Sequence, residues 1–227
     1  MKPEEIYAKL ANRELTPAEL AKKVSKKPEW IPILVDGMGQ KKAEVKYGCA
    51  KALRFVVDDR PELLYPLFDH FAEMLDSRNN IFQWEAIYLL AGLVSVDEEN
   101  KIEALIPRYF ARVEGPVMIT AANIIKGASE IARARPDLAK RIVGDILRAE
   151  KGRYETSECY EIVCGEALKA FDKIYKWLDR PGPVVEFAER HLGSHRNSTH
   201  AAAEKLLARH KRWGKSLRCE VRSEPAD

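Results

Sequence analysis

The sequence predicts an all-α protein, a right-handed α-solenoid of about five stacked helical hairpins with additional terminal helices. Two observations support this prediction. First, apolar residues recur at the spacing of a helical face in one segment after another, as in Leu64, Leu67 and Phe71, and no stretch alternates convincingly with the period of two typical of strands. Second, a small residue followed three positions later by an apolar residue returns at a nearly constant interval.

The small residue of this repeat is alanine, at positions separated by 36, 36, 45 and 36 residues: Ala50, Ala86, Ala122, Ala167 and Ala203. The residues three positions later are Leu53, Leu89, Ile125, Ala170 and Leu206. Proline marks the same period, because Pro136 and Pro181 are also 45 residues apart. A period of this length holds two antiparallel helices, which alanine allows to approach closely while the apolar residue fills the seam to the next pair.

Helix starts are marked along the chain. Thr16 and Glu19 form a capping box with Pro17 in the first turn, and Asn80 with Gln83 makes a similar pair. The expected helices are a short one at 3 to 12, a pair at 16 to 25 and 28 to 37, pairs starting near 42 and 61, 80 and 98, 116 and 136, and 157 and 183, and a last helix near 196 to 213.

Polar breaks separate the two helices of each pair. Proline cannot continue the preceding helix, yet it is pre-organised for the first turn of a new one. We therefore expect Pro61, in DDRP, and Pro136, in ARARP, at or next to the first turn of the second helix. EENK, near residue 99, takes the same place in the next pair without proline.

The composition is that of an ordinary globular protein, with 46% hydrophobic and 32% charged residues. We expect a single repeat domain over residues 1–215, followed by a polar, disordered tail over 216–227. The start of the chain lacks the apolar core of a secretory signal, and the longest apolar run is about half of a membrane span. A cytoplasmic protein without membrane contact is expected.

The sequence predicts no catalytic residue, cofactor or metal. Cys49, Cys159 and Cys164 lie in helical apolar patterns, where a free thiol behaves as a small hydrophobe. His191 and His195 have the spacing of zinc ligands, but Gly193 between them is expected to end the helix. Motifs typical of nucleotide binding, zinc proteases and serine hydrolases are absent from the sequence.

Three successive units resemble HEAT repeats, the armadillo-like helical hairpins that stack into a curved rod. These units are KYGCAKALRFVVDDRPELLYPLFDHFAEML, QWEAIYLLAGLVSVDEENKIEALIPRYFARV and MITAANIIKGASEIARARPDLAKRIVGDIL, and the resemblance extends over residues 16 to 213. It implies a scaffold or binding surface, and it brings no catalytic motif with it.

The resemblance also implies that the second helix of each pair lines a concave face. The polar residues expected there include Arg108, Arg112, Arg141, Arg148, Glu186 and Arg190. They form either a solvated polar face or a groove that holds a charged partner. The loop of residues 150 to 157 is longer than its counterparts, and it presents Arg153 and Tyr154 as further candidate contacts.

Six cations without an intervening acid gather near the C-terminus: Lys205, Arg209, Lys211, Arg212, Lys215 and Arg218. They are either the polar outer face of a terminal repeat or a patch for nucleic acid or an acidic partner. Two functions follow from the sequence. The leading hypothesis is a non-catalytic scaffold or adaptor that binds a protein partner through the concave face. The alternative is a nucleic-acid-binding protein, including a DNA-repair enzyme similar to the alkylpurine glycosylases.

Overall fold

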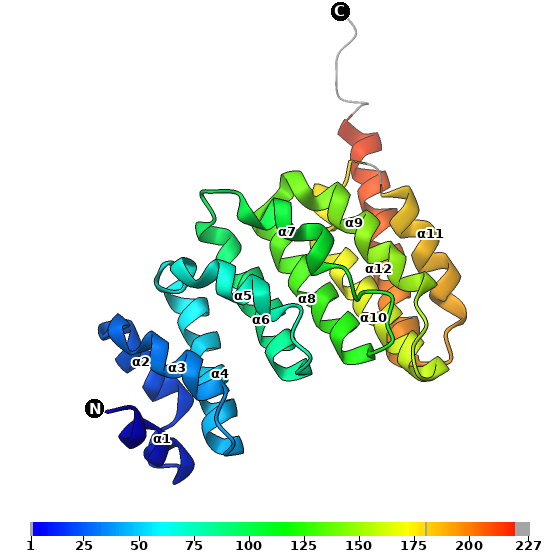
Figure 1. Cartoon of the computed structure of the whole chain (residues 1–227). Coiled ribbons are helices and arrows are strands. Elements are labelled where there is room, and N and C mark those ends of the chain that lie inside the picture. Colours follow the sequence, from blue (N-terminus) through cyan, green and yellow to red (C-terminus); the bar gives the residue numbers. More distant parts are fainter. Residues whose placement is uncertain (1, 180, 221–227) are drawn as a thin grey trace, which may run out of the picture. The chain divides into compact units, whose positions relative to one another are not determined.

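The computed structural model describes residues 2–179 and 181–220, with side chains up to residue 211. Twelve α-helices account for most of this part of the chain, and it contains no strand (Figure 1). The predicted all-α class is therefore confirmed. The helices are α1 (Pro3–Ala11), α2 (Pro17–Lys26), α3 (Ile31–Met38), α4 (Ala43–Asp59), α5 (Phe68–Met74), α6 (Asn80–Leu93), α7 (Lys101–Tyr109), α8 (Met118–Ala134), α9 (Ala139–Leu147), α10 (Ser157–Ile174), α11 (Gly182–Arg190) and α12 (Asn197–Glu220).

Short 3-10 helices precede or follow many of these helices: η1 (Pro28–Trp30), η2 (Pro61–Leu63), η3 (Tyr65–Leu67), η4 (Val94–Val96), η5 (Pro136–Leu138), η6 (Arg148–Lys151), η7 (Tyr175–Trp177) and η8 (His191–Gly193). The last helix continues to Glu220, beyond the expected end near residue 213. Residues 221–227, which belong to the tail expected from the sequence, lie outside the described residues.

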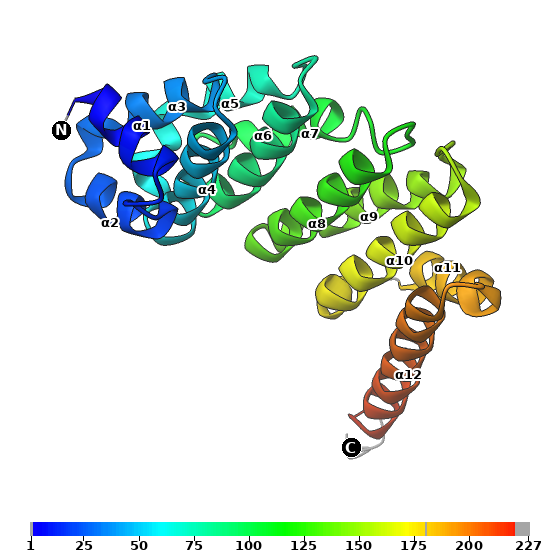
Figure 2. The same cartoon turned by 90° about the horizontal axis from the view of Figure 1, so that it is seen from below.

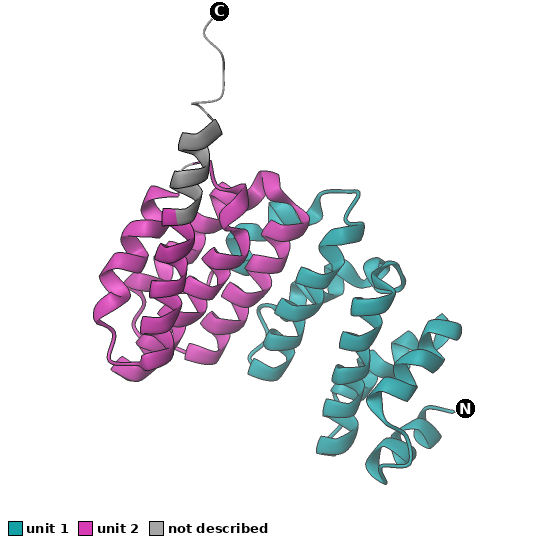
Figure 3. Ribbon diagram, turned by 180° about the vertical axis from the view of Figure 1, so that it is seen from behind, with its two compact units in different colours: residues 1–109 teal, residues 110–227 magenta. Residues whose placement is uncertain are grey.

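The chain divides into two compact units, residues 1–109 and 110–227 (Figure 3), and the single repeat domain expected over 1–215 stays a prediction. In unit 1, α4 packs against α1, α2 and α3 and also against α6, which in turn packs on α5. The fully buried side chains of this unit include Leu20, Leu53, Phe71 and Ile87. They come from α2, α4, α5 and α6 and form its core.

Unit 2 contains two layers of helices. In one layer α10 lies between α8 and α12 (Figure 2). In the other layer α9 packs on α8 and α10, and α11 packs on α12 and α9. The rings of Phe171 and Phe187 meet edge to face, with centroids 5.4 Å apart. This aromatic pair is part of the buried core of the unit.

The burial that the sequence predicts for the five alanines is confirmed. Ala50, Ala86, Ala122, Ala167 and Ala203 are all buried, and each lies on α4, α6, α8, α10 or α12 in turn. The apolar residue three positions later is buried in every case. A small side chain at these positions lets neighbouring helices approach closely.

The break at Pro136 lies where the sequence placed it, because Pro136 is the first residue of η5 and α9 follows at Ala139. Pro61 is the first residue of η2, but the expected helix start near 61 is replaced by two 3-10 turns, and α5 begins only at Phe68. Arg135, just before Pro136, forms an ion pair of 2.7 Å with Asp137.

Helix capping agrees with the sequence at one position and differs at another. The Thr16 hydroxyl accepts from the backbone N–H of Glu19, and the Glu19 carboxylate accepts from the backbone N–H of Thr16, so the capping box is confirmed. The second predicted cap is wrong by one residue. Asn79, rather than Asn80, accepts from the N–H of Ile81, while the buried Gln83 amide donates to the carbonyl of Leu75, 2.9 Å away.

Candidate interaction surfaces

Three of the five arginines expected to form a partner-binding ridge, Arg108, Arg148 and Arg190, form ion pairs within the protein. In unit 1, Arg108 donates to Asp76 at 2.7 Å. In unit 2, Arg148 contacts both Glu114 at 2.7 Å and Asp145 at 3.2 Å. The hydrogen bond that Arg148 donates to Glu114 is the main reason that the pKa of Arg148 is raised.

Arg190 makes two hydrogen bonds of 2.7 Å to Glu150, and this pairing lowers the pKa of the Glu150 carboxyl. Arg112, Arg141 and Glu186 are exposed. The ridge therefore consists largely of charges that carboxylates of the same unit already balance, and it is a weak source of positive potential.

The long loop before α10 is tied to the chain that precedes α8. Tyr154 is half-buried, and its hydroxyl donates to the carbonyl of Val113 at 2.6 Å. The exposed Arg153 donates through its backbone N–H to the carbonyl of Glu114 at 2.9 Å. Gly115 has a φ of 102°, and a Cβ there would overlap the Arg153 carbonyl oxygen. The expectation of an exposed aromatic contact at Tyr154 therefore does not hold.

A cluster of ionisable groups lies between α10, η6 and η8. His191 is buried, and its Nε2 atom is 3.5 Å from Glu150. Burial lowers the pKa of His191, raises the pKa of Tyr160, and raises the pKa of the Cys164 thiol to about 12. A thiol with so high a pKa is a poor nucleophile. Among the described residues, no group of three or more His, Cys, Asp or Glu side chains is placed to hold a metal ion.

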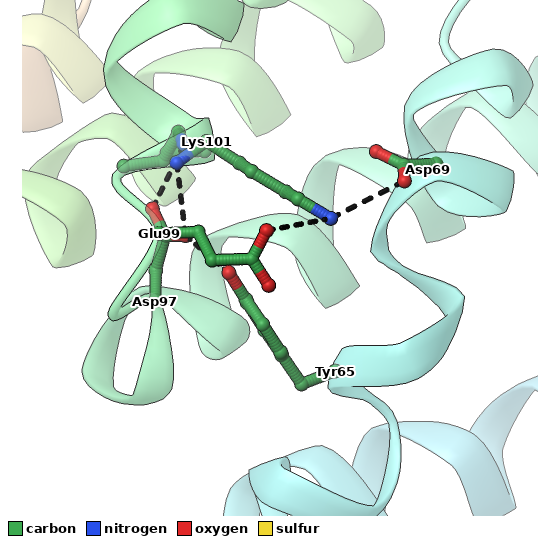
Figure 4. A network of polar contacts seen from close by, with 6 residues as sticks. Tyr65, Asp69, Asp97, Glu99 and Lys101 are labelled. Atoms are coloured by element: carbon green, nitrogen blue, oxygen red, sulfur yellow. Dashed lines mark hydrogen bonds and ion pairs between the residues drawn. The ribbon is translucent and has the colours of Figure 1, made fainter.

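The EENK connection in unit 1 is held by a polar network (Figure 4). Asp97 accepts from the backbone N–H groups of Lys101 and Ile102, at 3.0 and 2.8 Å, and from the Tyr65 hydroxyl at 2.7 Å. The Lys101 ammonium reaches Asp69 at 3.3 Å and Glu99 at 3.5 Å. Asp97 thus caps the start of α7, where the other connections use proline, and the network has a structural role.

Three large aromatic rings are exposed on α4 and α6 of unit 1. The exposed fractions are 52% for Tyr47, 39% for Phe55 and 38% for Tyr88. Lys51 lies one helical turn from both Tyr47 and Phe55, and its ammonium is 5.9 Å from the centre of the Phe55 ring. The Arg54 guanidinium is 4.7 Å from the centre of the Tyr88 ring. We call Tyr47, Lys51, Arg54, Phe55 and Tyr88 the aromatic surface.

Contacts between α4 and α6 hold two side chains of the aromatic surface, Arg54 and Tyr88. Arg54 donates two hydrogen bonds, of 2.7 and 2.8 Å, to the carboxylate of the buried Glu85. The Tyr88 hydroxyl lies 3.0 Å from both carboxylate oxygens of Asp58. These bonds fix the Arg54 plane and the Tyr88 ring before any partner arrives.

Sequence reasoning did not identify the aromatic surface. Tyr88 belongs to the apolar run IYLLAGLVSV, whose buried and exposed residues cannot be separated by hydropathy. One signal was present in α4, because Tyr47, Lys51 and Phe55 recur every four residues and so fall on one face. That face lies opposite buried residues such as Leu53 and Val56.

A second candidate surface lies on unit 2. It consists of three triads in which one carboxylate pairs with two cations: Lys126–Glu166–Lys169, Lys173–Glu130–Arg133 and Lys205–Asp172–Arg209. The first two triads link α8 to α10, and the third links α10 to α12. We call this surface the basic face. Of the six cations singled out from the sequence, Lys205 and Arg209 belong to the third triad and Lys211 is exposed. The side chains of Arg212, Lys215 and Arg218 lie outside the described part.

Comparisons with known proteins extend only to the fold. No family model and no curated protein matches the sequence. One similar solved structure is the crystal structure of an engineered protein, a target of the Northeast Structural Genomics Consortium. It has 18% sequence identity and a TM-score of 0.53, and the match covers 92% of this chain and 91% of that chain. Of the helices that the structure describes, none combines the length and apolar character needed to span a bilayer. The cytoplasmic location stays a prediction.

Proposed function

We propose that this protein is a HEAT-like α-solenoid that acts as a non-catalytic scaffold or adaptor, and that it binds a protein partner through the aromatic surface. The observation that carries the proposal is the exposure of Tyr47, Phe55 and Tyr88 on two adjoining helices. Tyrosine, phenylalanine and arginine are enriched in protein interfaces, and tyrosine and arginine often contribute most of the binding energy.

The fixed geometry of the surface favours binding. Arg54 is held by Glu85 and Tyr88 is held by Asp58, so these side chains lose little conformational freedom when a partner covers them. The ordering of a long side chain at an interface costs about 0.5–1.5 kcal/mol, and this surface avoids part of that cost.

The chemistry of the surface defines the partner segment. The rings offer apolar area, and Lys51 adds an ammonium beside Phe55. A complementary segment presents an apolar side chain to the rings and a carboxylate to Lys51. The arginines of the predicted ridge fit this role less well, because carboxylates of their own unit neutralise Arg108, Arg148 and Arg190.

Removal of the exposed rings tests the proposal. Proteins captured by the wild-type chain are compared with those captured by Y47A/F55A, and the affinity of each purified partner is then measured by calorimetry. We expect the double variant to weaken binding by about 10-fold or more, since loss of an interface anchor typically exceeds 1 kcal/mol. I119A is the matched control, because Ile119 is a comparably exposed apolar residue in unit 2. Equal binding by Y47A/F55A and the wild type would contradict the proposal.

A further inference from the structure

We propose that the basic face of unit 2 binds the phosphate backbone of nucleic acid. The inference begins with the composition of the triads. Each triad has two cations and one carboxylate, so the face has six cations, three carboxylates and a formal surplus of three positive charges. Arg148 shows the opposite arrangement, with one cation between two carboxylates. Positive potential therefore accumulates on the basic face.

The depth of the charged groups strengthens this potential. The carboxylate side chains of Glu166 and Asp172 are only 16% and 11% exposed. The cations that pair with them project further, with exposed fractions of 52% for Lys169 and 68% for Lys205. Around Glu166 and Asp172, a molecule that approaches the face therefore meets ammonium and guanidinium groups before it meets a carboxylate, whereas the Glu130 side chain is 39% exposed.

Pairing with a carboxylate does not use up the cations. A lysine ammonium has three N–H donors and an arginine guanidinium has five. Lys169 makes a 2.8 Å bond to Glu166, and Lys173 makes a 3.0 Å bond to Glu130. Each lysine can thus be held in place by one N–H while other donors remain for phosphate oxygens.

The extent of the face fits an extended polyanion. Packed helices lie about 8–10 Å apart, so triads on α8, α10 and α12 extend across roughly 20 Å. Duplex DNA has one phosphate charge per about 1.7 Å of its axis, which places about a dozen phosphates within that span. The α8, α10 and α12 residues of the triads are charged rather than apolar. Such a face suits phosphate contacts better than insertion into a bilayer, which needs a large apolar face.

Titration of labelled nucleic acid with the full chain tests the inference. Anisotropy is measured with a 20-base-pair DNA duplex, an RNA duplex of the same sequence and a single strand, from 50 to 200 mM NaCl. We expect the logarithm of the binding constant to fall with the logarithm of salt concentration, with a slope of about −3 to −5, because three to six phosphates are neutralised. The duplex and single-strand arms identify which nucleic acid supplies the phosphates.

Variants of opposite effect locate the site. K126Q/K169Q/K173Q is expected to make the slope shallower by about 3 and to raise Kd by about 10-fold or more. K140Q/K151Q is the matched control, since both lysines are exposed in unit 2 outside the triads. E130Q removes a negative charge from the face and is expected to strengthen binding a few-fold. Because E130Q is expected to strengthen nucleic-acid binding, and misfolding would weaken it, the effect of E130Q cannot come from misfolding.

Three outcomes would overturn the inference: no salt-dependent binding to any of these nucleic acids, the same slope for the triple variant and its control, or weaker binding by E130Q. Co-sedimentation with phosphatidylserine vesicles supplies a further arm. Binding to vesicles but to no nucleic acid, lost in the triple variant, would assign the face to an anionic membrane. Y47A/F55A is expected to bind nucleic acid as tightly as the wild type. Loss of nucleic-acid binding would therefore count against the basic face alone, and loss of protein binding would be tested separately at the aromatic surface.

Discussion

The contact between α10 and α12 predicts that Gly165→Ala destabilises unit 2. A Cβ at Gly165 would lie 2.6 Å from the Thr199 hydroxyl oxygen, whereas ordinary contacts begin at 3.4 Å. Thr199 is fully buried and its hydroxyl donates to the carbonyl of Glu161 at 2.8 Å, so the side chain has little room to move. Overpacking of this kind costs about 1–3 kcal/mol, and the higher helix propensity of alanine offsets about 1 kcal/mol of that loss.

We therefore expect Gly165→Ala to lower the free energy of unfolding by about 0–2 kcal/mol. The measurement is urea unfolding followed by circular dichroism at 222 nm. Gly144→Ala in α9 is the matched control, because a Cβ there has no atom within 4 Å. It is expected to stabilise by up to about 1 kcal/mol.

A double-mutant cycle makes the test sharper. Thr199→Ala removes the hydroxyl that obstructs the new methyl group, so G165A/T199A should lose less stability than the two single variants lose together. If Gly165→Ala stabilised the protein as much as Gly144→Ala does, the close packing of α10 on α12 would be refuted.

Two further predictions concern packing and pH. Ala86→Leu places a large side chain at a fully buried position and should cost about 1–3 kcal/mol; an unchanged melting midpoint would contradict the packing at Ala86. Burial lowers the pKa of His191 below 6.5, so the unfolded chain binds a proton more readily and stability is lost as pH falls below about 6.5. Glu150 has a lowered pKa because of Arg190, and its contribution is present above pH 4.5 and lost as pH falls through its folded pKa. The free energy of unfolding, measured with urea between pH 7 and 5.5, should depend less steeply on pH for H191Q than for H195Q. H195Q is the control, because His195 is exposed. Equal slopes for the two variants would contradict this account of His191.

The sequence alone determined the helices and much of the core. Caps such as the Thr16–Glu19 box depend on atoms only three residues apart, so they can be recognised locally. The same holds for Pro61 and Pro136, whose rings restrict their own backbone. Burial of the five repeat alanines was also predictable, because period and residue size are properties of the sequence.

The candidate surfaces were decided by tertiary structure. Glu85 binds Arg54 beside the exposed ring of Tyr88, and Glu166 lies between Lys126 and Lys169. The sequence around each glutamate does not predict these different roles. Each of these carboxylates has a partner far away in the sequence, because Arg54 is 31 residues from Glu85 and Lys126 is 40 residues from Glu166. Periodicity shows which side of a helix is polar, but it does not show which neighbouring helix that side meets.

The same distinction explains the ridge and the long loop. The sequence identified Arg148, Arg190 and Tyr154 as polar or amphipathic groups outside the core, which follows from their own chemistry. The structure pairs them with Glu114, with Glu150 and with the carbonyl of Val113. Whether a charge remains available to a partner depends on the groups that the fold brings within about 4 Å of it. Residue type and helical period therefore determine the elements, while the packing of distant helices determines which of their polar groups stay open to other molecules.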